Sequence, residues 1–92
     1  MKKTTNSNQN GGKVRARVVF RVFRNGEVIA LMPDFQERNG DILSYMHIGQ
    51  HSAADPLIVR DTKPATAQQY APLLAELRGI GYDVQIRQRL TR

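Results

Sequence analysis

An alternating segment followed by an Asn-Gly pair is the feature that most constrains the fold of this chain. In KVRARVVFRVFR, residues 13–24, apolar residues occupy every second position from Val14 to Val22, and three of the intervening positions hold arginine. This period of two predicts a half-buried β-strand with one apolar and one basic face. Asn25-Gly26 favours a two-residue hairpin turn, because both central residues of such a turn take positive φ. VIALM, residues 28–32, is then the returning strand.

Two further segments are typical of extended structure. Pro33 is expected to end the second strand, because proline cannot donate a hydrogen bond to the ladder. Residues 42–49 (ILSYMHIG) are rich in strand-favouring residues and predict a third strand paired with the second. Residues 57–60 (LIVR) fit either a short edge strand or an extended connection, and the sequence does not decide between these two alternatives.

One helix is predicted in KPATAQQYAPLLAELRGIGY, residues 63–82. Thr66 and Gln69 have the spacing of a capping box, the apolar residues that follow form one stripe, and the glycines near the end supply a stop. Pro72 lies beyond the first turn, so that either the helix bends there or its first turn is loose. Residues 82–90 (YDVQIRQRL) alternate again and predict a final strand.

This order of elements (β-β-β-α-β) predicts a single α+β domain, in which one helix packs on one face of a mostly antiparallel sheet of 3–4 strands. A right-handed crossover through the helix places the last strand parallel to the first and beside it, which gives the order last, first, second, third. Residues 1–13 are polar and basic and are expected to form a disordered tail, which leaves residues 14–92 as the domain. The core is expected to contain Val18, Phe20, Val22, Val28, Ala30, Leu73, Leu74, Leu77, Val84 and Ile86.

Composition narrows the classes of function. The chain has 92 residues, a net charge of +6 and no cysteine, which excludes disulfides and thiolate metal sites. Residues 1–24 carry seven Lys or Arg and no acid, and residues 83–92 carry three Arg and one Asp. Positive charge at both ends of the chain favours a polyanion or an acidic protein as partner. The sequence contains no apolar run typical of a signal peptide or membrane span, so we expect a cytoplasmic protein without a membrane partner.

A basic sheet face is the main candidate binding site. The alternation and the parallel last strand are expected to bring five arginines and one aromatic residue onto the face that the helix leaves open: Arg15, Arg17, Arg21, Arg87, Arg89 and Phe23. Arginine binds phosphate and aromatic rings stack on bases, so this face predicts weak and mainly non-specific nucleic-acid binding.

The same open face supports a different hypothesis. It is expected to expose Val19, Ile29, Leu31 and Tyr45. This much apolar surface favours a protein-interaction or inhibitor module, or a homodimer interface. One observation separates the two hypotheses. An apolar patch with arginines at its rim would favour protein binding, whereas a continuous arginine stripe would favour nucleic acid.

SYMHIGQHSAADP, residues 44–56, holds both histidines of the chain, His47 and His51. His47 is expected on the third strand, on the same face as Tyr45, and His51 in the turn that follows. A metal would need Asp55 as third ligand, and no motif marks a nucleophile, so we predict neither a metal site nor catalysis and no cofactor. Tyr45, His47 and His51 are interpreted as a partner-binding surface.

Three segments together resemble a family of short proteins, without an established activity, of bacterial phages, plasmids and conjugative elements: VFRVFRNGEVIALMP, SYMHIGQHSAADP and TKPATAQQYAPLLAELRGIGYDVQI. The resemblance covers roughly residues 17–90. It implies a prokaryotic, cytoplasmic setting on a mobile genetic element and carries no activity over to any residue. Small proteins in that setting often bind nucleic acid or block a host factor, so the resemblance fits both hypotheses.

Overall fold

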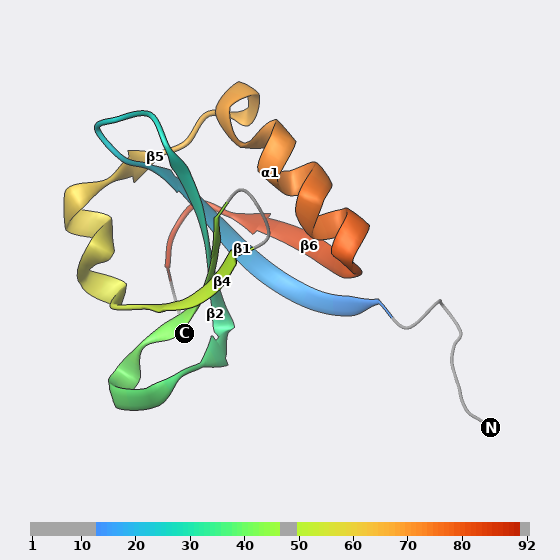
Figure 1. Cartoon of the computed structure of the whole chain (residues 1–92), viewed down its shortest axis with the longest axis horizontal. Coiled ribbons are helices and arrows are strands. Elements are labelled where there is room, and N and C mark those ends of the chain that lie inside the picture. The colour runs from blue at the N-terminus through green and yellow to red at the C-terminus, as the bar shows by residue number, and fades with distance from the viewer. Residues whose placement is uncertain (1–12, 47–49, 91–92) are drawn as a thin grey trace.

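The computed structural model describes residues 13–46 and 50–90, which contain six strands, one α-helix and two short 3-10 helices (Figure 1). The predicted α+β class is confirmed, but the sheet of six strands is larger than the 3–4 strands expected. Nearly all of the predicted tail, residues 1–12, lies outside the described residues. The elements are β1 (Val14–Val22), β2 (Val28–Gln36), η2 (Arg38–Gly40), β3 (Ile42–Met46), β4 (Gln50–Ala54), η3 (Pro56–Asp61), β5 (Lys63–Pro64), α1 (Ala67–Ile80) and β6 (Tyr82–Arg87), where η denotes a 3-10 helix.

The sheet is mixed and centred on β1. On one side β1 pairs antiparallel with β2, and the order continues through β3 to β4. On its other side β1 pairs parallel with β6 along Val14–Val19 and antiparallel with β5 at Arg21 and Val22. The parallel placement of the last strand beside the first is therefore confirmed. The complete order differs from the prediction, because β4 and β5 add two strands that the sequence pattern does not mark.

The hairpin at Asn25-Gly26 is present, but its turn is of a different kind from the one predicted. The Phe23 N–H donates to the Glu27 carbonyl (2.8 Å) and the Gly26 N–H donates to the Phe23 carbonyl (2.9 Å). Gly26 has φ of 90°, whereas Asn39 is the one non-glycine residue with positive φ among those described. The loop is therefore a three-residue turn with glycine in the left-handed position. The Asn25 side chain stabilises it by accepting a hydrogen bond from the Glu27 N–H (2.9 Å).

Three boundaries differ from the sequence predictions. Pro33 does not end β2, because the strand absorbs it in an irregularity of register between Met32 and Gln36. Residues 50–54 form β4, a strand that pairs back onto β3. Residues 57–60 adopt neither of the extended alternatives, because they lie in η3, which begins with Pro56 and is capped by Asp55.

The helix α1 follows the sequence prediction closely. The Thr66 hydroxyl accepts from the Gln69 N–H (3.2 Å), and the Gln69 side chain accepts from the Thr66 N–H (2.8 Å), which completes the capping box. The helix ends at Gly81, whose φ of 122° excludes most other residues. Pro72 lies inside the helix. No helix in the described part of the chain combines the length and the apolar character needed to cross a membrane.

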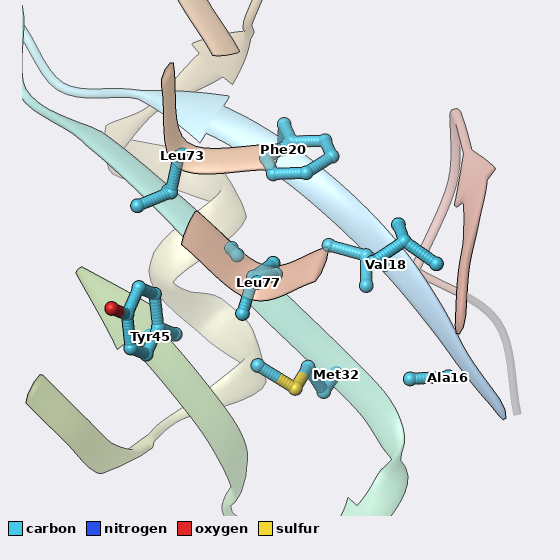
Figure 2. Packing of buried hydrophobic residues seen from close by; sticks show 9 residues of the cluster. Ala16, Val18, Phe20, Met32, Tyr45, Leu73 and Leu77 are labelled. Atoms are coloured by element: carbon cyan, nitrogen blue, oxygen red, sulfur yellow. The ribbon is translucent and has the colours of Figure 1, made fainter. Parts of the chain in front are cut away.

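The first hydrophobic core lies between α1 and the sheet. Figure 2 shows Leu77 of the helix close to Met32 of β2, and Leu73 and Val18 belong to the same buried cluster. Phe20 stacks on Tyr70, with 4.4 Å between the ring centroids. Most of the predicted core is buried here. Three members of the predicted list (Val28, Leu74 and Ile86) are only partly buried at its margin.

A second core lies on the opposite face, which the sequence analysis expected to be open. Its buried residues are Val19, Ile29, Leu31, Ile42 and Ala54. Side chains of η3 and of the segment after β6 pack over them, and Figure 1 shows η3 (yellow) and α1 (orange) on opposite sides of the strands. The expectation of an open face is therefore wrong. β1 is apolar at consecutive positions Val18–Phe20, which is typical of a strand that is buried on both faces.

Candidate functional site

Arg21, which was predicted on the basic face, forms its hydrogen bonds with other parts of the protein. Its Nε donates to the Thr62 hydroxyl (3.0 Å), and one terminal nitrogen donates to the carbonyls of Val59 (2.9 Å) and Thr62 (2.5 Å). The side chain is partly buried beneath the end of η3. Arg21 therefore anchors the segment that covers the second core, and these hydrogen bonds leave it less to offer a phosphate than the sequence pattern predicts.

Arg17 is paired with a carboxylate of the neighbouring strand. Its Nε donates to Oδ1 of Asp34 (2.7 Å), and its backbone N–H donates to Oδ2 of the same side chain (3.0 Å). These hydrogen bonds hold the pKa of Asp34 below its ordinary value, and the more distant charge of Arg87 adds a smaller effect of the same sign. The charge of Arg17 is thus matched within the protein, which reduces what it offers to a phosphate.

Arg15, Arg87 and Arg89 remain exposed. In the parallel β1–β6 pair, Arg15 lies opposite Asp83 and Arg87 lies opposite Val19, so Arg15 and Arg87 project from the same face of the sheet. With the amide oxygen of Gln85 turned towards it, the guanidinium of Arg15 donates to that neutral side chain. We call Arg15, Arg87 and Arg89 the arginine edge.

Phe23 is placed differently from the prediction. It is half-buried and packs against the second core, because it follows β1 at the point where the chain turns. Its ring is therefore not displayed on an open sheet beside the arginines.

Two of the predicted partner-binding residues, Tyr45 and His51, lie on the helix side of the sheet. Tyr45 is only 2% exposed, because its pairing with Ala30 directs it into the first core, and its hydroxyl donates to Oε1 of Glu76 (2.9 Å). His51 lies on β4 opposite Tyr45 and not in a turn, and the two rings meet edge to face at 4.9 Å. His47 lies outside the described residues. Tyr45 was expected at the surface and is instead buried, whereas His51 is exposed.

His51 also shows how strongly the sheet curls. Its Nε2 lies 3.1 Å from the hydroxyl oxygen of Tyr82 on β6, although β4 and β6 stand at opposite ends of the strand order. Asp55, the other residue weighed for a metal or a base, accepts from the Leu57 N–H (2.9 Å) at the start of η3. Within residues 13–46 and 50–90, no three side chains of the metal-binding types gather.

A groove of about 790 Å³ lies beside the β1–β2 turn and was not among the sites predicted from the sequence. Its walls come from the turn, from the end of η3, from β5 and from the start of α1, and they carry Arg24, Arg60 and Lys63. All three of these side chains are exposed, and none forms an ion pair with a described residue. They come from segments far apart in the chain, so no local pattern indicates that they meet.

The described surface thus presents two basic regions, the arginine edge and the groove, and both are suited to holding anions. Comparisons of the chain with protein-family models, with curated proteins and with solved structures find no match.

Proposed function

We propose that the protein is a small, non-enzymatic module that binds nucleic acid weakly and without sequence preference through the arginine edge. The observation that carries this proposal is the contrast between the two kinds of residue on one sheet face. The apolar residues Val19 and Leu31 are at most 1% exposed, whereas Arg15 and Arg87 project to solvent from the same face. A basic surface without an apolar centre favours a polyanion over a protein partner.

A protein-interaction or inhibitor module of a mobile genetic element is the second candidate, and it loses most of its support. It required an exposed apolar patch, and the residues expected to form that patch are buried in the two cores. The large apolar side chains that are exposed among the described residues (Val14, Leu57 and Ile80) belong to three different elements, β1, η3 and α1. A cytoplasmic location remains part of the proposal.

Contacts from three arginines set the expected strength of binding. Counterion release gives a slope of log affinity against log salt of about −2 for single strands and about −2.7 for duplex. Raising the salt concentration from about 50 mM to about 200 mM should then weaken single-strand binding about 20-fold. Base-edge readout is not expected, because arginines on a sheet face without further polar partners contact phosphates.

The test compares two double variants of equal charge. Arg15→Ala/Arg87→Ala removes two members of the arginine edge, and Arg38→Ala/Arg78→Ala removes two exposed arginines from η2 and α1. Binding of a labelled single-stranded oligonucleotide is measured by fluorescence polarisation across a salt series. The first variant should lower the magnitude of the slope by about 1.4, whereas the control should leave it unchanged. Equal effects of the two variants, or no binding by the wild type at about 50 mM salt, would overturn the proposal.

A further inference from the structure

The groove beside the β1–β2 turn has cations on three of its walls. Arg24 comes from the turn, Arg60 from η3 and Lys63 from β5, and Asp61 is the one acidic residue among the lining residues. Three cations against one carboxylate give the groove a positive potential, and a concave surface concentrates such a potential. Its volume of about 790 Å³ lies in the range of small-molecule sites.

The backbone that carries these cations is held in place by contacts from the rest of the fold. Arg21 donates to the carbonyls of Val59 and Thr62, on either side of Arg60. Lys63 is paired with Val22 in the sheet, and the Ala65 N–H donates to the Phe20 carbonyl (3.0 Å). A ligand would therefore meet cations whose backbone is already ordered, which reduces the entropy that binding costs.

Apolar residues and one side-chain amide donor also line the groove. Val22 and Phe23 are among its lining residues, and Phe23 is only half-buried. Gln69 lines the opposite side, and its oxygen is already used by the capping box, which leaves its amide nitrogen to donate. An aromatic ring next to a set of cations fits a ligand that joins a planar ring to a phosphate.

We propose that this groove binds a nucleotide unit with a terminal phosphate, in which Arg24, Arg60 and Lys63 hold the phosphate and Phe23 contacts the base. The ligand is either a free nucleoside monophosphate or the phosphorylated end of a nucleic-acid strand, because the two share this chemistry. The site is separate from the arginine edge and does not depend on it.

The experiment uses short single-stranded oligonucleotides, labelled at one end, that carry or lack a phosphate at the other end. Polarisation titrations are made with the wild type, with Arg60→Ala/Lys63→Ala and with the charge-matched control Arg38→Ala/Arg78→Ala. Circular dichroism checks that each variant is folded, which is expected because all four side chains are exposed. The wild type and the control should prefer the phosphorylated strand by about tenfold or more, and the groove variant should lose this preference.

Competition then identifies the source of the phosphate. Displacement by a nucleoside monophosphate, but not by the nucleoside, assigns a free nucleotide, whereas displacement by phosphorylated strands alone assigns a strand end. Equal affinity of the wild type for both strands, or an unchanged preference in the groove variant, would overturn the inference. The Arg15→Ala/Arg87→Ala variant separates this inference from the proposed function. If this variant binds both strands more weakly but still prefers the phosphorylated strand, the arginine edge and the groove bind independently.

Discussion

At the scale of single residues, three arginines at alternate-face positions of one strand have different roles. Arg15 is exposed, Arg17 is paired with Asp34, and Arg21 is bonded to the end of η3. The strand pattern gives all three the same face but does not say what lies over that face. The role of each arginine is therefore set by its neighbour from another part of the chain.

The first prediction concerns Arg21. Arg21→Ala leaves the carbonyls of Val59 and Thr62 without their charged donor, and it should lower the free energy of unfolding by about 1.5–3 kcal/mol. Arg15→Ala is the control, and because Arg15 is exposed it should change stability by no more than about 0.5 kcal/mol. Urea denaturation followed by circular dichroism measures both variants. Equal stability of the two would contradict the anchoring role of Arg21.

At the scale of elements, α1 is specified locally at both ends and disturbed in the middle. Thr66 and Gln69 form the capping box, and Gly81 takes the left-handed conformation that ends the helix. Pro72 lies between them and cannot donate to the carbonyl of Gln68. The helix forms despite this loss because Leu73 and Leu77 are buried against the sheet.

The second prediction concerns this proline. Pro72 is exposed, so Pro72→Ala should restore the missing hydrogen bond without loss of packing. The restored hydrogen bond stabilises the folded protein by more than the greater flexibility of the unfolded chain destabilises it. The free energy of unfolding should therefore rise by about 2 kcal/mol. Thermal denaturation should show a midpoint about 10 °C higher. Gln68→Ala, an exposed change in the same helix, serves as the control and should leave the midpoint nearly unchanged. A lower midpoint for Pro72→Ala would show that the proline ring stabilises the helix.

At the scale of the whole molecule, the sheet separates two hydrophobic cores. Leu77 of α1 lies in the first and Leu31 of β2 lies in the second, and both are 0% exposed. A small domain has little stability to spare, and dividing its apolar residues between two layers makes each layer necessary. The cover over the second core also buries Val19, Ile29 and Leu31, which were expected at the surface.

The third prediction compares the two cores. Leu31→Ala and Leu77→Ala should each lower stability by about 2–5 kcal/mol, because each leaves a cavity in a closed core. If the second face were open, Leu31→Ala would cost little. Leu57, which is 54% exposed, provides the control, and Leu57→Ala should have a small effect. Chemical denaturation of the three variants gives the comparison, and a Leu31→Ala variant as stable as Leu57→Ala would contradict the second core.

The sequence by itself determined the features that depend on neighbouring residues. The hairpin at Asn25-Gly26, the capping box of Thr66 and Gln69 and the glycine stop at the end of α1 are all encoded within a few positions. The parallel β6 could also be predicted, because the handedness of a helical crossover leaves few other places for that strand. These local signals need no knowledge of the rest of the chain.

Only the tertiary structure decided which surfaces are free. η3 covers the face that carries Val19 and Leu31, Arg21 turns to η3, and Asp34 takes up the charge of Arg17. The groove likewise forms where the β1–β2 turn, η3, β5 and α1 meet. Contacts between residues distant in the chain depend on how the elements pack, and an alternating pattern gives the side of a strand but not what covers it.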